Sequence, residues 1–188
     1  MPTEFVVHDW PLPYETKLDH RELSAVDLVV IHCTELPDMA MTREFGERVH
    51  YPDKGTGNSG HYYITEAGET YRFVANDRVA NHTKDWNTRS IGIEMFNLGR
   101  YPHWGVSSHQ SFTVAYTQEQ IRSLLSLLAK LRDEIPTLRY IAGHEDLDTR
   151  LEPASDDPKI LLRRRQDPGP LFPWDEVVPA AQLTRLKP

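Results

Sequence analysis

The hydrophobic pattern of the chain contains three short, nearly continuous apolar runs. Residues 26–34 (VDLVVIHCT) are rich in β-branched side chains, and residues 90–95 (SIGIEM) and 139–142 (RYIA) form two more runs. A strand that is covered on both faces needs apolar residues on both, so runs of this kind indicate buried strands. We therefore predict three core strands, separated from one another by long stretches of chain.

One longer segment has the period of a helix. Residues 117–134 carry apolar side chains at helical spacing along one face. These side chains are Ile121, Leu124, Leu125, Leu128 and Leu131. Thr117 and Gln120 match a capping box at the start of the segment, and Pro136 follows its end. The pattern therefore predicts a helix that packs one face against the core.

The remaining elements are shorter. Residues 42–49 are predicted to form a short helix, and residues 61–65 and 70–74 a β-hairpin around the turn at Ala67-Gly68. Because strands and helices alternate along the chain, we expect an α/β fold in which α-helices flank a central mixed β-sheet.

A length of 188 residues suits a single domain with a substantial core. We expect the domain to span residues 26–178. Residues 1–25 contain several prolines and are expected to form an irregular N-terminal extension packed on the domain, and residues 179–188 a C-terminal tail.

Composition excludes several classes of protein. With 28 Asp and Glu against 21 Lys and Arg, the net charge of −7 argues against nucleic-acid binding. The single cysteine excludes a disulfide framework and a cysteine-rich zinc module. The chain has no apolar run of about 18 residues that could form a transmembrane segment. The first 20 residues lack the features of a signal peptide, so we expect a cytoplasmic protein, or a periplasmic or secreted one if a leader was removed.

Three potential metal ligands stand at the ends of predicted elements. His32 lies at the end of the first core strand, His144 follows the third, and Asp167 opens the segment DPGP. Two histidines and one carboxylate leave the fourth position of a tetrahedral zinc ion free for water, as in a catalytic site. The alternatives are ordinary: a histidine at a strand end is often a hydrogen-bonded structural residue, and Asp before Pro-Gly is a common turn residue.

Local sequence context adds to this pattern. The motifs VVIHCT, SGHYYI with EAGETYRFV, NHT, RSIGIEM, AGHEDL and DPGPLFPW follow one another between residues 26 and 174. In this order they resemble the zinc-dependent N-acetylmuramoyl-L-alanine amidases of the type 2 family, which are related to phage lysozyme-type amidases and to peptidoglycan recognition proteins. The resemblance implies a mixed sheet flanked by helices, and Zn²⁺ held by His32, His144 and Asp167.

Glu94 lies inside the apolar segment SIGIEM. A carboxyl that faces inward there has a raised pKa and suits the role of general base beside a zinc-bound water. Alternatively, Glu94 points outward and pairs with a surface cation, while the side chains on either side of it face the core. The resemblance implies a glutamate that assists catalysis at this position.

Arg165 departs from the family pattern, in which many members carry Lys two residues before the last ligand. Arginine remains protonated and cannot donate a proton at neutral pH, but its fixed charge can stabilise an oxyanion. We therefore assign Arg165 a catalytic role, with a solvated basic run over residues 163–165 as the alternative.

His61 and His82 match positions near the family's cleft, where polar groups meet the substrate or hydrogen-bond to the ligands of the zinc ion. We assign them to substrate binding. As alternatives, His61 caps a strand and His82 is a loop residue.

The expected function is zinc-dependent hydrolysis of the amide between N-acetylmuramic acid and L-alanine in peptidoglycan or muropeptides, as in muropeptide recycling. The alternative is a peptidoglycan-binding module of the same fold without activity. We expect a monomer whose partners are peptidoglycan fragments or muropeptides.

Overall fold

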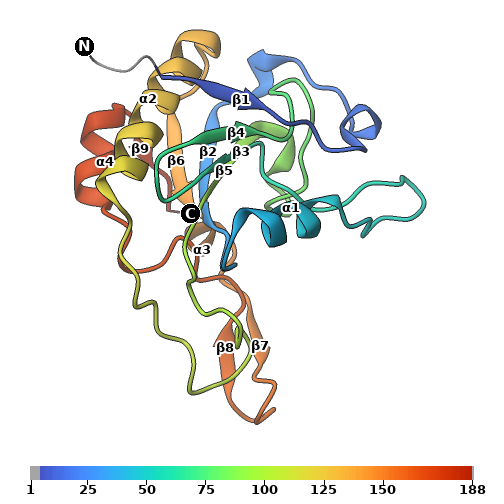
Figure 1. Ribbon diagram of the computed structural model, residues 1–188, viewed down its shortest axis with the longest axis vertical. Helices are drawn as coiled ribbons and strands as arrows, with labels where there is room; N and C mark the ends of the chain where they lie inside the picture. Colours follow the sequence, from blue (N-terminus) through green and yellow to red (C-terminus); the bar gives the residue numbers. More distant parts are fainter. Residues whose placement is uncertain (1–4, 188) are drawn as a thin grey trace.

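The computed structural model describes residues 5–187 and contains a seven-stranded mixed sheet (Figure 1). The strand order is β1-β4-β3-β5-β2-β6-β9. In this order the strands are Val7–Asp9, Thr70–Arg72, Tyr62–Ile64, Ser90–Met95, Leu28–Cys33, Tyr140–Gly143 and Thr184–Arg185. The three predicted core strands are β2, β5 and β6, which lie side by side and parallel at the centre of the sheet. The predicted hairpin is the antiparallel pair β3 and β4.

The register of the central strands brings three polar side chains to one edge of the sheet. His32 on β2 lies opposite Glu94 on β5, and Ile31 lies opposite Gly143, which immediately precedes His144. Parallel strands end at the same edge, so the chain positions that follow β2, β5 and β6 are neighbours there.

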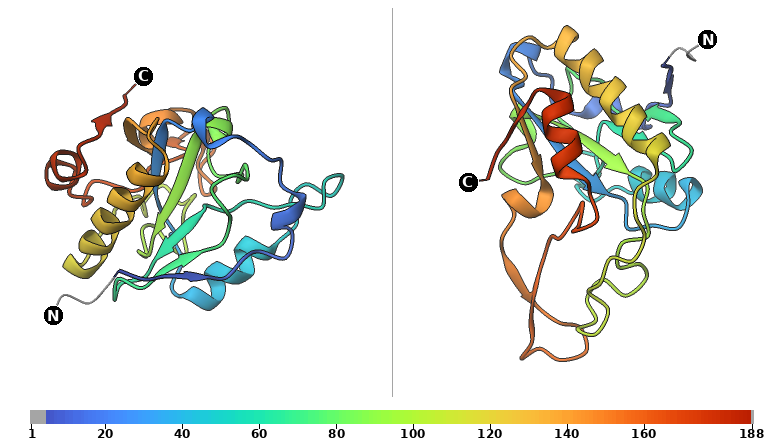
Figure 2. Two further views of the ribbon diagram at one scale, coloured as in Figure 1. Left: turned by 90° about the horizontal axis from the view of Figure 1, so that it is seen from above. Right: turned by 90° about the vertical axis from the view of Figure 1, so that its left-hand side faces the viewer.

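Helices cover one face of the sheet. Helix α2 (Gln118–Glu134) begins with the predicted capping box and packs its leucines on the sheet. It lies on the sheet beside helix α4 (Trp174–Ala181), as Figure 2 shows. On the opposite face, Met39 of helix α1 (Met39–Glu47) packs with Phe73 and other residues of a second, smaller apolar cluster. The flanked mixed sheet confirms the predicted fold class.

The prediction of an irregular N-terminal segment is wrong for Val7–Asp9. These residues form β1, which pairs with β4 in parallel at the edge of the main sheet. An edge strand of three partly exposed residues needs no apolar run, so the hydrophobic pattern does not mark it. Near the other end of the chain, β9 likewise extends the sheet beside β6.

Two long connections form a protruding lobe, which we call the loop lobe. It consists of residues 97–116 and 148–166, and the second segment contains the hairpin β7 (Leu151–Pro153) and β8 (Leu161–Arg163). The two segments are joined by hydrogen bonds, including one from the Ser155 amide to the Gly105 carbonyl at 2.7 Å. No helix in the described part of the chain is long and apolar enough to cross a membrane.

Candidate active site

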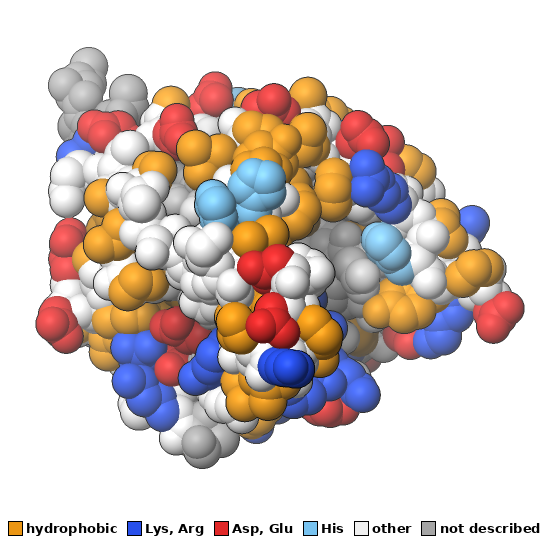
Figure 3. All heavy atoms as spheres, turned by 90° about the horizontal axis from the view of Figure 1, so that it is seen from below, with side chains coloured by type: hydrophobic (Ala, Val, Ile, Leu, Met, Phe, Trp, Pro, Cys, Tyr) orange, Lys and Arg blue, Asp and Glu red, His pale blue; other side chains and the backbone are white. Residues whose placement is uncertain are grey.

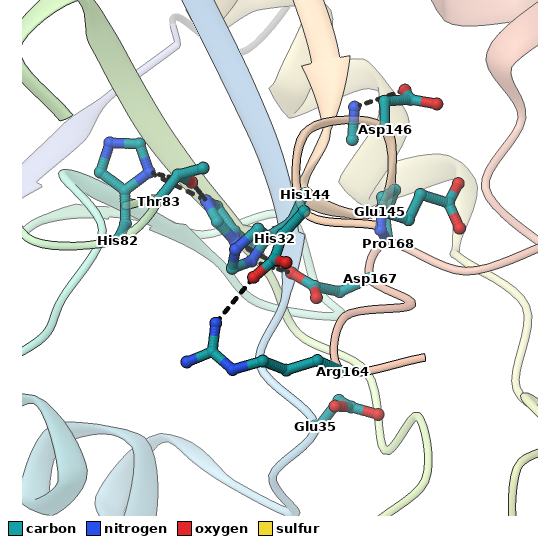
Figure 4. A network of polar contacts seen from close by, with 12 residues as sticks. His32, Glu35, His82, Thr83, His144, Glu145, Asp146, Arg164, Asp167 and Pro168 are labelled. Carbon is teal, nitrogen blue, oxygen red and sulfur yellow. Dashed lines mark hydrogen bonds and ion pairs between the residues drawn. The ribbon is translucent and has the colours of Figure 1, made fainter. Parts of the chain in front are cut away.

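The three predicted metal ligands converge at the carboxyl edge of the sheet (Figure 4). His32 comes from the end of β2, His144 begins the short helix α3 (His144–Leu147), and Asp167 lies in the loop before α4. Asp167 Oδ2 lies 2.9 Å from His32 Nδ1 and 3.2 Å from His144 Nδ1. All three side chains are buried.

The protonation of these groups fits a divalent cation. Burial lowers the pKa of His32 to about 4, so its ring is neutral and has a lone pair to offer. Burial alone would raise the pKa of Asp167, but His144 and His32 outweigh it and hold the pKa well below its usual range. Ligand atoms about 2.0–2.1 Å from a tetrahedral ion lie about 3.3 Å apart. The donor separations given above are close to that value, so the residues fit a metal ion.

The donors lie in a cleft of about 620 Å³ between α1 and the loop lobe. From the side of α1 the cleft is lined by Phe45, and from the loop lobe by Trp104, Glu152 and Arg164. Seen from the end that carries the lobe, Figure 3 shows charged side chains of both signs next to hydrophobic ones. This lining offers both apolar and charged contacts to a ligand.

Glu94 lines the cleft on the same face of the sheet as His32. Its neighbours Ile93 and Met95 face the core under α2. Because successive side chains of a strand point to opposite faces, Glu94 points away from that core, as in the alternative prediction of an outward-facing glutamate. The opposite face at this point is the floor of the cleft rather than open solvent. Burial, followed by the charge of Asp167, raises the pKa of Glu94 to about 8. The backbone passes close by at Gly60, where a Cβ atom would lie 2.9 Å from Glu94 Cγ.

The three arginines of residues 163–165 have different environments. Arg163 donates to the carbonyl of Glu145, and Arg164 forms an ion pair with Asp148 at 2.7 Å. Arg165 lines the cleft, and its buried Nε has no hydrogen-bond partner among the described residues. Arg165 is therefore the member of this run that has a buried donor to offer to a ligand.

The two further histidines differ sharply in position. His61 is fully buried; its Nδ1 accepts from the Gly92 amide and its Nε2 lies 3.0 Å from the Arg78 carbonyl oxygen. The geometry therefore gives His61 no direct contact with a ligand in the cleft. His82 lines the cleft, but its Nδ1 lies 3.0 Å from Nε2 of His32. Burial lowers the pKa of both histidines well below the usual value.

The sequence reasoning missed a buried ion pair beside the site. The Glu35 carboxylate accepts from Arg100 Nε at 2.7 Å and Nη2 at 2.8 Å, and both side chains line the cleft. Glu35 lies two residues after the end of β2, and Arg100 lies in the loop lobe, so the pair fixes the lobe to the sheet. The partners are 65 positions apart, and no local pattern marks them.

We expect Glu35→Gln to lower the free energy of unfolding by about 3–5 kcal/mol, because it leaves a buried guanidinium without its opposing charge. Glu35 and Arg100 are only 8% and 5% exposed. Urea denaturation measures the loss. The matched control is Glu44→Gln, which breaks the exposed pair with Arg48 and should cost about 0–1 kcal/mol. Equal losses in the two variants would contradict a stabilising role for the buried pair.

Comparison with known proteins agrees with this geometry. A protein-family model described as N-acetylmuramoyl-L-alanine amidase matches residues 22–170. The search of curated proteins gives no significant match. Among solved structures, the N-acetylmuramoyl-L-alanine amidase LysC from Clostridium intestinale URNW has 20% sequence identity and a TM-score of 0.68, over 95% of this chain and 99% of that chain.

Two further similar structures contain ligands. AMPDH3 from Pseudomonas aeruginosa, in complex with anhydromuramic pentapeptide, has 24% identity and a TM-score of 0.63, over 85% of this chain and 61% of that chain. AmiD from E. coli, in complex with anhydro-N-acetylmuramic acid-L-Ala-D-gamma-Glu-L-Lys, has 20% identity and a TM-score of 0.64, over 85% and 58%. These likenesses show a shared fold. Because the family model spans most of the chain, the protein belongs to the type 2 N-acetylmuramoyl-L-alanine amidase family, whose members are peptidoglycan amidases.

Proposed function

We propose that the protein hydrolyses the amide between N-acetylmuramic acid and L-alanine with a zinc ion held by His32, His144 and Asp167. The observation that carries this proposal is the convergence of these three buried donors beside Glu94 in one cleft. Two imidazoles and one carboxylate are ligands that zinc accepts, and a three-ligand protein site is typical of catalytic zinc.

Zinc bound there would lower the pKa of a bound water to about 7 and polarise the scissile carbonyl. The protein supplies the proton transfers and further charge. Glu94, whose environment raises its pKa, takes the proton of the attacking water and returns it to the leaving amine. The Arg165 guanidinium stabilises the negative charge that develops on the carbonyl oxygen.

We expect Arg165→Ala to lower kcat by about 10²–10³, the usual cost of losing one donor to an oxyanion. Arg165→Lys keeps the charge and should retain most of the activity. Steady-state kinetics on a muropeptide tests both variants. Arg163→Ala is the matched control, since Arg163 donates to a backbone carbonyl instead of lining the cleft. An unchanged kcat in Arg165→Ala would remove this residue from the mechanism.

The proposed substrate is a soluble anhydro-muropeptide. The support is that the similar structures of AMPDH3 and AmiD were determined with such ligands. The cleft, at about 620 Å³, is also of a size that accommodates a peptide joined to one sugar.

To test the function, zinc-loaded protein is incubated with an anhydro-muropeptide and, separately, with whole sacculi, and the products are identified by mass. We expect release of a free stem peptide, faster from the soluble substrate. Release from sacculi alone would contradict the proposed substrate. Binding of either material without cleavage would contradict hydrolysis and favour a peptidoglycan-binding module.

A further inference from the structure

A chain of hydrogen bonds leads from His32 through His82 to a backbone carbonyl outside the cleft. His32 Nε2 lies 3.0 Å from His82 Nδ1, and His82 Nε2 lies 3.2 Å from the hydroxyl of Ser90. The Ser90 hydroxyl lies 2.8 Å from the carbonyl oxygen of Trp86. Ser90 is fully buried at the start of β5. The hydrogen-bond chain therefore links a proposed zinc ligand to the backbone of the turn that precedes β5.

The Trp86 carbonyl at the end of this series fixes the donor and the acceptor of each hydrogen bond in it. The Trp86 carbonyl only accepts, so the Ser90 hydroxyl donates to it and offers a lone pair to His82. His82 therefore donates from Nε2, and the Nδ1 of its neutral ring is an acceptor. His32 in turn donates from Nε2, which leaves the lone pair of His32 on Nδ1, the atom that faces Asp167.

The packing holds the His82 ring in the position that this series of hydrogen bonds requires. Its ring lies against β5 at Gly92, where a Cβ atom would come within 2.7 Å of His82 Cγ. The side chain of Asn87 accepts from the backbone amides of His82 at 3.0 Å and Thr83 at 2.7 Å, which fixes the turn that carries the ring. A glycine on the strand and an anchored turn thus define where the His82 ring lies.

We propose that His82 is a positioning residue that selects the His32 tautomer with its lone pair on Nδ1, and that it does not itself bind the substrate. The inference rests on the proposed function in one respect, that His32 binds zinc. A partner that accepts from the free N–H of a ligating histidine orients the ring, and its loss typically weakens metal binding by about 10–100-fold.

Among the described residues, the hydroxyl of Thr83 is the competing acceptor that contacts both rings. This hydroxyl lies 3.0 Å from His82 Nδ1 and 3.4 Å from His32 Nε2. The distance from His32 Nε2 to the Thr83 hydroxyl is 0.4 Å longer than the distance from His32 Nε2 to His82 Nδ1. The Thr83 hydroxyl can itself donate to His82. Thr83→Val, which removes the hydroxyl at nearly constant volume, is therefore the control for this contact.

The test compares zinc affinity in full-length variants by competition with a chelator. His82→Phe keeps a ring of similar size without an acceptor and should bind zinc about 10–100-fold more weakly. His82→Asn returns an acceptor oxygen close to the position of Nδ1 and should recover most of the affinity, while Thr83→Val should change it little. Equal losses in the Phe and Asn variants, or a larger loss in Thr83→Val than in His82→Phe, would overturn the proposal.

A spectroscopic measurement tests the hydrogen bond itself. In zinc-loaded wild-type protein labelled with ¹⁵N, we expect a through-hydrogen-bond coupling between His32 Nε2 and His82 Nδ1. Its absence would overturn the proposal, even where the substituted proteins fail to fold. Neither measurement depends on hydrolysis, so a failure of His82 as a positioning residue is distinguishable from a failure of the proposed amidase reaction.

Discussion

Replacing His144 with alanine is expected to remove bound zinc and hydrolysis together. The substitution leaves two of the three proposed protein donors, His32 and Asp167, and removes the contact between His144 and Asp167. Loss of a group that only orients a ligand already weakens metal binding by about 10–100-fold, so loss of a ligand should exceed that. Zinc content after dialysis and turnover of a muropeptide measure the two effects.

The control for this variant is His20→Ala. His20 is exposed, pairs with Asp77 at the surface and lines no part of the cleft. It should keep stoichiometric zinc and full turnover. If His144→Ala retained stoichiometric zinc, the assignment of His144 as a ligand would be wrong.

Replacing Glu94 with glutamine should give the second large effect, a fall in turnover of about 10²–10⁴ with zinc binding retained. Glutamine has nearly the same shape, but it cannot take up and return a proton. Because Glu94 is not one of the three converging donors, its neutral replacement leaves the metal ligands in place. Kinetics and zinc analysis on the same preparation separate the two properties.

Glu152→Gln provides the matched control, since Glu152 also lines the cleft but lies in the loop lobe and is largely exposed. Its turnover should remain within a few-fold of wild type. A Glu94→Gln protein with unchanged turnover would exclude Glu94 as the general base.

The central strands and the three proposed metal ligands were predictable because each has a local signal. An apolar run marks β5 at its observed limits, and β2 and β6 to within two residues. His32 and His144 stand where such runs end, and the motif order identifies Asp167. The sequence also shows that Glu94 and its neighbours point to opposite faces of the sheet. Which face borders the cleft depends on where α2 packs, and the sequence of β5 alone does not predict that.

Other features depend on contacts between distant parts of the chain. The pair Glu35 and Arg100 forms only once the loop lobe folds back on the sheet. His61 and His82 each follow a polar loop in the sequence, yet His61 is fully buried and accepts from the Gly92 amide, whereas His82 lines the cleft. Tertiary packing makes that difference, so no local sequence pattern distinguishes the roles of the two histidines.

The most direct test of the account is hydrolysis of a defined anhydro-muropeptide by zinc-loaded protein in H₂¹⁸O, with both products identified by mass. Attack of water on the lactyl carbonyl puts one ¹⁸O atom into the carboxyl group of the sugar product. We predict this label, together with an unlabelled stem peptide that begins with a free L-alanine amine. An intact substrate, or ¹⁸O incorporated into a peptide fragment, would contradict it.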